Sequence, residues 1–372
     1  MDPRVYEAMK PYCMEEFGNP SAICQRGQHA KNALEQARLT VSTLLDAKPE
    51  EIIFTSGGTE SDNLALLGVA RAYKNKGKHI ITSTIEHHAV LHTAQHLEKE
   101  GFEVTYIPVE SNGIVDAAKV KEAMRDDTIL VSIMYANNEI GTIQPIAKIG
   151  RACKKRGIPF HTDACQATGA LQLSVDRLHV DLMTINGSKM YGPKGVGVLY
   201  VRSTVNIDPI MYGGQQEKGM RPGTENVAGI IGLAKALEIA EKEREKESAR
   251  LTELRDYMIT ELEQRIPKTE LNGDPVNRLP NNVNISILEI EGEALLLRLD
   301  MKGINASSGS ACTSGSLDPS HVILALGKTH LVAHGSIRFS LGKSTTKKDI
   351  DYVLNVLPEI VKDLRAISPL SV

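Results

Sequence analysis

Two side chains that could do chemistry lie close to apolar runs that predict buried strands. Asp163 falls in the run IPFHTDA, and Lys189 follows the run VDLMTI. Ligands of parallel α/β sheets sit outside the carboxyl ends of the strands, so an acid at one strand end and an amine beyond another can face one pocket. Pyridoxal 5'-phosphate (PLP) needs such a pair, because a lysine binds its aldehyde covalently and a carboxylate keeps its ring nitrogen protonated. The pair therefore points to PLP chemistry.

The same two residues also have an ordinary interpretation. The chain has 43 Lys plus Arg residues, and most lysines are solvated surface charges. An Asp at a strand end is commonly a helix cap or a turn former. Lys189 differs from a lysine on an exposed helix, because it enters a loop with glycines at 192, 195 and 197. Spacing alone leaves both interpretations open.

Other polar residues stand where predicted strands turn into helices. Residues 56–59, Ser-Gly-Gly-Thr, open a predicted helix, where free backbone N–H groups suit a phosphate, although a tight turn with a cap gives the same pattern. His87 stands in a similar turn, where an imidazole can stack on a ring or carry a proton. His88, His92 and His96 have a metal-like spacing but lack the glutamate of an HExxH motif, so we expect a solvated helix face and no metal site.

The five cysteines are odd in number and contain no CxxC pair, which favours reduced thiols over a disulfide framework or a zinc ribbon. Cys312 stands out, because it lies in the segment 305–320, which is rich in Ser, Gly and Thr. A thiol in such a mobile, partly exposed loop can reach a partner and react, with a passive surface thiol as the alternative. The others are expected to be small buried or incidental residues: Cys13, Cys24, Cys153 and Cys165.

Composition limits the classes of function. Hydrophobic residues make up 41% and charged residues 24% of the 372 residues, as in ordinary globular proteins with two domains. A net charge of -3 without a basic stripe argues against a nucleic-acid partner. The first residues lack an apolar signal region, and no apolar run approaches the length that spans a membrane. We expect a cytoplasmic protein with no membrane partner.

The pattern of strands and helices predicts an α/β fold followed by a smaller α+β unit. Residues 3–30 are expected to be irregular, and an amphipathic helix is predicted over 29–45. A long charged helix beginning at Val227 is expected to join the two domains. The closing helix is predicted to follow a cap at Thr345 or Thr346. Strands are predicted over 50–55, 79–84, 128–136, 158–164, 180–185, 196–202, 281–287 and 336–342.

Eight segments, in this order, carry a resemblance to a known family: SGGTESDN, EHHAV, ANNEIG, HTDACQ, SKMYGPKGVG, GMRPGTEN, SSGSACTSGS and SIRFSLG. The chain resembles the class I, NifS/IscS-like cysteine desulfurases, which are fold-type I PLP-dependent enzymes, from about Pro3 to Leu370. The resemblance implies a large α/β domain over 14–243 with a mostly parallel seven-stranded sheet. It implies a small α+β domain over 1–13 and 244–372 that carries the mobile Cys312 loop.

The resemblance also implies roles for particular residues. Its catalytic set is Lys189, which binds the cofactor covalently, Asp163 at the ring nitrogen, His87 stacked on the ring as acid or base, and the nucleophile Cys312. Substrate would be bound by Arg338, through its carboxylate, and by Asn138. The cofactor-binding set is Gly58, Thr59, His87, Asn138, Asp163, Gln166, Asn186, Ser188, Lys189 and, from the second subunit of a homodimer, Thr224.

The function implied is removal of sulfur from L-cysteine, which gives L-alanine and a persulfide on Cys312. The sulfur would pass to an acceptor protein, such as an iron-sulfur scaffold or a tRNA-thiolation enzyme, and Cys312 is also a candidate transient iron-sulfur ligand. The alternatives are a selenocysteine lyase and a non-catalytic PLP-fold sulfur carrier. The chain departs from the family's usual Ser-Gly-His-Lys, because it has Asn186 and Ser188 at the first and third positions.

Overall fold

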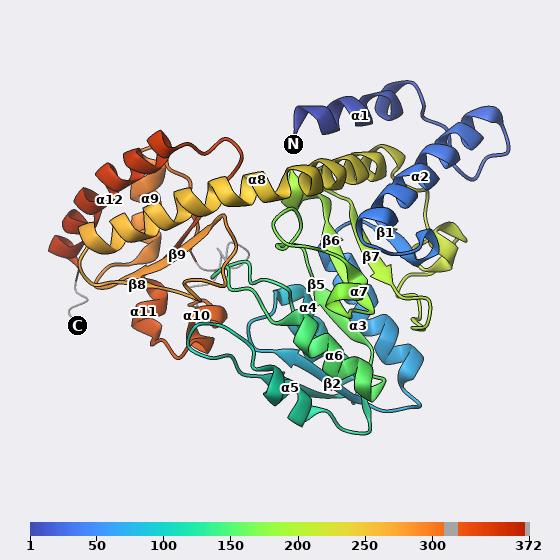
Figure 1. Cartoon of the computed structure of the whole chain (residues 1–372), viewed down its shortest axis with the longest axis horizontal. Coiled ribbons are helices and arrows are strands. Elements are labelled where there is room, and N and C mark those ends of the chain that lie inside the picture. The colour runs from blue at the N-terminus through green and yellow to red at the C-terminus, as the bar shows by residue number, and fades with distance from the viewer. Residues whose placement is uncertain (309–318, 369–372) are drawn as a thin grey trace. The chain divides into compact units, whose positions relative to one another are not determined.

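The computed structural model describes residues 1–308 and 319–368, which form two compact units (Figure 1). Unit 1 consists of Met1–Ile107, Ala117–Tyr135 and Pro145–Arg244. Unit 2 consists of the described residues of Pro108–Asp116, Ala136–Gln144 and Glu245–Val372. The long helix α8 (Val227–Arg265) begins in unit 1 and ends in unit 2, as expected for a helix that joins two domains.

Unit 1 is built on a seven-stranded sheet with the order β1-β7-β6-β5-β4-β2-β3. Strands β6, β5, β4, β2 and β3 run parallel to one another, whereas β7 is antiparallel to both of its neighbours. The predicted α/β class with a mostly parallel sheet is therefore confirmed. The strands are β1 (Ile52–Thr55), β2 (His79–Ser83), β3 (Glu103–Ile107), β4 (Thr128–Ser132), β5 (Phe160–Asp163), β6 (Leu182–Asn186) and β7 (Gly197–Val201).

Helix α3 (Gly58–Tyr73) lies against the middle of this sheet, where it contacts β4, β5, β6 and β7. Its apolar side chains share a buried core with β4, β6 and β7, and that burial is the main force that fixes the helix on the sheet. The other helices are α1 (Pro3–Met14), α2 (Gln25–Leu44), α4 (His88–Lys99), α5 (Ala117–Ala123), α6 (Ile146–Arg156) and α7 (Val175–Leu178), with short 3-10 turns η1 (Pro49–Glu51), η2 (Gly187–Met190) and η3 (Gln216–Gly219).

The expectation that residues 3–30 are irregular holds for 15–24, but it is wrong for α1 and for the start of α2. Helix α1 forms because Asp2 caps it by accepting the Arg4 N–H, and Pro3 occupies the first turn, where a missing N–H costs nothing. The Asp2 N–H donates to the Tyr191 carbonyl at 2.9 Å, and Val5 is fully buried. Residues 1–13 therefore lie in unit 1, whereas the sequence analysis had assigned them to the smaller domain.

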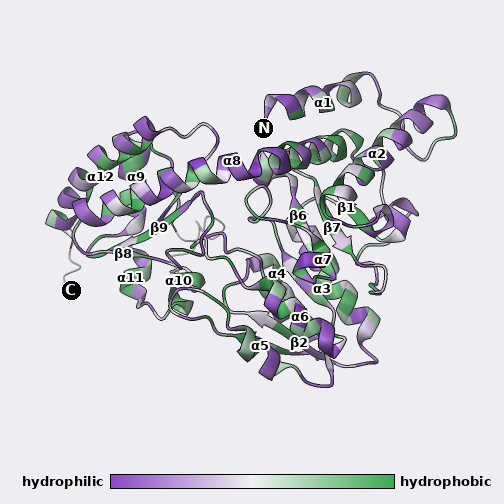
Figure 2. Ribbon diagram, in the orientation of Figure 1, coloured by the Kyte–Doolittle hydropathy of each residue, from purple (hydrophilic) through white to green (hydrophobic). Residues whose placement is uncertain are grey.

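Unit 2 contains an antiparallel sheet with the order β10-β9-β8, covered by helices. Its core is formed by apolar residues of β9, α9 and α12, and Figure 2 shows α12 with hydrophilic and hydrophobic sides. Thr346 caps α12 by accepting the Asp349 N–H, which settles which of the two predicted threonines is the cap. The elements are β8 (Thr269–Leu271), β9 (Asn282–Ile287), β10 (Ser336–Ser340), α9 (Gly292–Asp300), α10 (His321–Ala325), α11 (His330–His334) and α12 (Lys347–Ile367).

The segment 136–144 also belongs to unit 2, whereas the sequence analysis had placed it in the large domain. The reason is a set of hydrogen bonds within that unit. The side-chain amides of Asn282 and Asn284 both donate to the Glu139 carbonyl at 2.9 Å. Asn138 therefore belongs to unit 2.

A buried ion pair within unit 1 holds the glycine-rich loop that precedes α8. The Arg38 guanidinium binds both carboxylate oxygens of Glu217, at 2.9 and 2.7 Å, and the Phe54 N–H also donates to that carboxylate. Glu217 has φ 45°, a left-handed conformation that costs free energy for a residue other than glycine. The ion pair therefore holds the loop in a conformation that its backbone does not favour.

Glu217→Ala should lower the free energy of unfolding by about 3–5 kcal/mol, because it leaves the buried Arg38 without its main partner. Urea denaturation followed by circular dichroism measures the change. Glu35→Ala is the matched control, since Glu35 also pairs with Arg38 but its side chain is 52% exposed, so a loss below about 1 kcal/mol is expected. Equal losses in the two variants would contradict a dominant role for the buried pair.

Candidate active site

Asp163 lies where the sequence predicted, as the last residue of β5. Its side chain is 7% exposed, and its Oδ1 accepts the Cys165 N–H at 2.9 Å. In the parallel pair β5–β6, Asp163 is opposite Thr184. The carboxylate is therefore held at the carboxyl end of a central strand, and the carboxyl ends of the strands are where ligands of such sheets bind.

Lys189 lies just beyond the carboxyl end of the neighbouring strand, β6. β6 ends at Asn186, and the turn η2 that follows contains Lys189. The Asn186 Oδ1 accepts the Ser188 N–H at 3.3 Å and thereby caps this turn, while Tyr191 ends it with φ 62°. β5 and β6 are parallel neighbours. Asp163, which ends β5, and Lys189, which follows β6, therefore lie at the carboxyl ends of adjacent strands.

The loop between β1 and α3 comes close to these residues. Gly57 has φ 152°, which favours glycine, and α3 begins at Gly58. A Cβ placed on Gly58 would lie 2.8 Å from the Cys165 Sγ and 3.6 Å from the Asn186 Nδ2, so only glycine allows this approach. The first N–H groups of the 16-residue helix α3 are thus brought beside β5 and β6 as a positive end for an anion.

His87 caps α4 with its own ring. Its Nδ1 accepts the Ala89 N–H at 3.1 Å, so in the neutral imidazole the proton is on Nε2. His87 and Thr59 line one hollow of about 390 Å³, which brings together a predicted ring-stacking residue and a predicted phosphate-binding residue. The hollow is completed by Asn63, His88, Ala89, His92, Thr93 and His96.

Two histidines of α4, His88 and His92, lie close together. The rings of His88 and His92 lie 4.9 Å apart, but within residues 1–308 and 319–368 no group of three His, Cys, Asp or Glu side chains could hold a metal ion. Across the same described ranges, no helix combines the length and the apolar character needed to cross a membrane.

The remaining predicted residues are divided between the two units. In unit 1, Gln166 follows Cys165 and is half-buried, and Thr224 is exposed in the loop before α8. In unit 2, Arg338 lies in β10 and its Nη1 donates to the Asn138 carbonyl at 2.8 Å. Cys312 falls outside the described residues.

Sequence reasoning did not find one buried acid close to the site, Glu86. It is fully buried in the turn after β2, where the Ser83 hydroxyl donates to it at 2.5 Å and the Met134 N–H at 3.0 Å. Burial, aided by the nearby Asp163 charge, raises the pKa of Glu86 to about 8. The only signal in the sequence was its position next to His87, which does not reveal burial.

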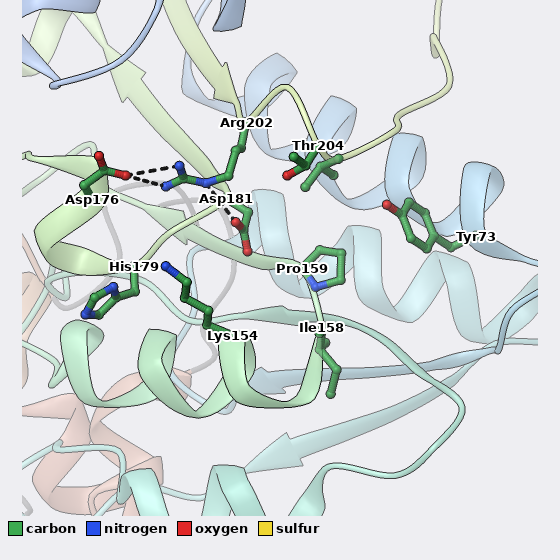
Figure 3. Close-up of a pocket in the computed structure, with 11 residues that line it drawn as sticks. Tyr73, Lys154, Ile158, Pro159, Asp176, His179, Asp181, Arg202 and Thr204 are labelled. Carbon is green, nitrogen blue, oxygen red and sulfur yellow. Dashed lines mark hydrogen bonds and ion pairs between the residues drawn. The ribbon is translucent and has the colours of Figure 1, made fainter.

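A second hollow, of about 270 Å³, lies at the opposite ends of the parallel strands (Figure 3). It is lined by residues that precede β5 and β6 and follow β7, so it is next to the amino ends of the parallel strands. Its Arg202 binds Asp176 and Asp181, each at 3.1 Å. A guanidinium already paired with two carboxylates is poorly suited to bind a further anion, so this hollow is not the candidate active site.

The residues at the carboxyl ends of β5 and β6 fit PLP. The close approach at Gly58 leaves the start of α3 open to a phosphate, Lys189 supplies the amine, and Asp163 supplies a carboxylate for a ring nitrogen. His87 adds a flat ring in the hollow that Thr59 also lines. The described part of the chain thus contains a group for each end of the cofactor.

Comparisons with known proteins agree with this site. Residues 1–353 match the family model Aminotransferase class-V. The cysteine desulfurase IscS of Dictyoglomus turgidum is 56% identical over 365 residues, which cover 98% of this chain and 93% of that protein. A solved NifS-like protein superposes with a TM-score of 0.92 at 38% identity and covers 98% of this chain and 97% of its own.

A second solved structure, SspA in complex with cysteine, has a TM-score of 0.81 at 38% identity and covers 92% of this chain and 95% of its own. The chain therefore belongs to the class-V aminotransferase family, and within it to the cysteine desulfurases of the NifS/IscS kind. The resemblance identified from the eight sequence segments is confirmed.

The burial of Glu86 predicts a pH dependence of stability. Its pKa is about 4.3 in an unfolded chain and about 8 in the folded protein, so unfolding releases a proton between these values. Stability should therefore fall by up to about 1.4 kcal/mol per pH unit across this window, and the Glu86→Gln variant should lack that contribution. Urea denaturation of both proteins from pH 5 to pH 8 measures the difference.

The exposed Glu7→Gln variant controls for the loss of one carboxyl, since Glu7 is solvated on α1. Its difference from the wild type should stay constant across the same pH range. A constant difference for Glu86→Gln would contradict the assignment of a protonated acid at this position.

Proposed function

We propose that the protein is a PLP-dependent cysteine desulfurase that takes sulfur from L-cysteine and releases L-alanine. The observation that carries the proposal is the placement of Asp163 and Lys189 after adjacent parallel strands, with the start of α3 beside them. The family to which the chain belongs supports the same reaction.

Different residues of unit 1 bind the different parts of the cofactor. Lys189 binds the aldehyde, Asp163 keeps a proton on the ring nitrogen, and the N–H groups of Gly58 and Thr59 bind the phosphate with help from Asn186 and Ser188. When bound, PLP supplies an electron sink that weakens the bond between the substrate's β-carbon and its sulfur. The proton on the Nε2 of His87 makes this ring a candidate acid for the reacting atoms.

On the substrate side, Arg338 binds the carboxylate of L-cysteine. A guanidinium suits this task because it can donate two parallel hydrogen bonds to a carboxylate. The Asn138 carbonyl accepts one of its N–H groups and helps to orient it. Gln166 is assigned to the phenolic oxygen of the cofactor, as the resemblance implies.

The sulfur is transferred to Cys312. Its thiolate attacks the substrate sulfur, a sulfur–sulfur bond forms, the carbon–sulfur bond breaks, and the β-carbon takes up a proton to complete alanine. The buried cysteines of the described chain are poor alternatives, because burial raises the pKa of the Cys153 and Cys165 thiols above the ordinary value. The persulfide is then available to an acceptor.

The oligomeric state, location and acceptor are also part of the proposal. The exposure of Thr224 leaves its hydroxyl available to the phosphate of a second subunit, which supports a homodimer. The free cysteines of the described chain suit the reducing cytoplasm. An iron-sulfur scaffold or a tRNA-thiolation enzyme is the expected acceptor, and we assign Cys312 a further role as a transient iron-sulfur ligand.

Alanine and sulfide release from L-cysteine, with added PLP and a reductant, tests the reaction. We expect the wild type to be active, and Lys189→Ala and Cys312→Ala to lose at least about 100-fold in kcat, because each removes a group that forms a covalent bond. Cys24→Ala, which removes an exposed cysteine, is the matched control and should keep full activity. A PLP-loaded wild type that releases no alanine would refute the proposed function.

Gly58→Ala tests the phosphate site separately. The new Cβ would lie 2.8 Å from the Cys165 Sγ, and relief of that clash costs about 1–3 kcal/mol, so we expect PLP to bind about tenfold more weakly. Equilibrium dialysis of PLP measures the affinity. The double variant Gly58→Ala/Cys165→Ala should recover most of the loss, and a failure to recover would show that the contact with Cys165 is not the cause.

A further inference from the structure

Two consecutive carbonyl groups of unit 2, those of Asn138 and Glu139, are bound by side chains of the three-stranded sheet. The Arg338 Nη1 donates to the Asn138 carbonyl at 2.8 Å. The side-chain amides of Asn282 and Asn284 donate to the Glu139 carbonyl, each at 2.9 Å, so both lone pairs of this oxygen are used. The sheet therefore holds this stretch of backbone at two neighbouring oxygens.

Arg338 on β10 and Asn284 on β9 are directly opposite each other. Arg338 exchanges both of its backbone hydrogen bonds with Ser307, at 3.0 and 2.7 Å, and none is left for β9. In an antiparallel ladder this makes Arg338 and Asn284 a non-hydrogen-bonded pair, the kind whose side chains lie closer together. The arginine assigned to the substrate carboxylate thus has the Asn284 side chain as its direct neighbour.

The orientation of the Asn284 amide follows from its partners. A backbone carbonyl can only accept, so the group that faces Glu139 has to be the Asn284 Nδ2. The Asn284 Oδ1 then accepts from the Asn272 Nδ2 at 2.9 Å, and the same Nδ2 donates to the Ser286 Oγ at 2.8 Å. These three side chains are fully buried, where an unpaired amide is costly. Asn272 therefore keeps Asn284 in the orientation that binds Glu139.

The backbone that carries the two carbonyls forms a closed turn. The Asn137 Oδ1 accepts the Glu139 N–H at 2.8 Å and the Ile140 N–H at 2.9 Å. The Gly141 N–H donates to the Asn137 carbonyl at 3.0 Å. Because the turn is closed by its own hydrogen bonds, a side chain that holds the Glu139 carbonyl also fixes the place of Asn138.

We propose that Asn284 is a positioning residue of the desulfurase reaction, which holds the turn so that the Asn138 carbonyl orients Arg338 toward the carboxylate of L-cysteine. Asn272 supports Asn284 by fixing its amide. Orientation matters here because a guanidinium binds a carboxylate best through two parallel hydrogen bonds in one plane. The inference deepens the proposed function and rests on it, since the role of Arg338 toward the substrate belongs to that proposal.

Steady-state kinetics of alanine release by the PLP-loaded protein tests this role. Asn284→Ala removes a donor to Glu139 and opens space beside Arg338, so we expect KM for L-cysteine to rise about tenfold while kcat changes less than about twofold. The loss falls on KM because the carboxylate contact is made before and during the reaction alike. An unchanged KM would overturn the proposal.

Two further variants separate positioning from a loss of stability. Ser286→Ala is the matched control, because it removes a buried hydrogen bond of Asn272 but keeps the bond between Asn272 and Asn284, so KM should change less than about 1.5-fold. Asn272→Ala leaves Asn284 without the donor that orients it, so KM should rise about threefold. Equal KM values in these two variants would contradict the role of Asn284, and this comparison decides where Asn284→Ala does not fold.

A double variant tests whether Asn284 acts through Arg338. Calorimetry measures the binding of L-alanine, the product, to the PLP-loaded protein and needs no turnover. Asn284→Ala should weaken binding about tenfold in the wild-type background but less than about twofold in Arg338→Ala, because the contact that it orients is then absent. Equal losses in the two backgrounds would overturn the proposal.

The proposed function and the role of Asn284 fail in different ways. A PLP-loaded wild type that binds L-alanine but forms none from L-cysteine would refute the proposed function and leave the double variant to decide on Asn284. A wild type that desulfurates L-cysteine, with KM unchanged in both Asn284→Ala and Asn272→Ala, would refute the role of Asn284 alone.

Discussion

The candidate site depends on one constraint: the buried region around the carboxyl end of β5 can hold few charges. Asp163, Asp62 and Glu86 are three carboxyl groups close enough to affect one another, and two of them are fully buried. Three anions in such a region would cost far more than folding can supply. Burial and the neighbouring Asp163 carboxylate raise the pKa of both Asp62 and Glu86, which favours their neutral forms and relieves the conflict.

The topology of the sheet makes this arrangement possible. Because β5 and β6 are parallel neighbours, the crossover over residues 164–181 returns the chain so that Asp163 and Lys189 lie at the carboxyl ends of adjacent strands. α3 contacts β4, β5, β6 and β7, so its first turn lies close to the residues that end β5 and β6. One turn further along the helix, the Oδ1 of the buried Asp62 is 3.7 Å from the His161 Nε2.

Much of this could be predicted from the sequence, because apolar runs mark strands and the carboxyl ends of strands mark the site. Asp163 and Lys189 were found in this way. β3 was missed, because its residues are only partly buried and show no continuous apolar run. The partners of Asp62 and His161 could not be predicted, since they come from α3 and three strands and depend on how that helix packs on the sheet.

The loop that carries Thr224 shows how stability and function are linked in unit 1. Glu217 binds Arg38 and keeps the loop against β1 in a conformation that its backbone does not favour. Further along, the Arg221 Nε donates to the Glu60 Oε1 at 3.0 Å, and Glu60 also accepts the Ser56 N–H at the start of α3. Two ion pairs therefore fix the loop, one beside β1 and the other at the start of α3. Thr224 follows both contacts along the chain, so the loop that carries it depends on Glu217 and Glu60 for its support.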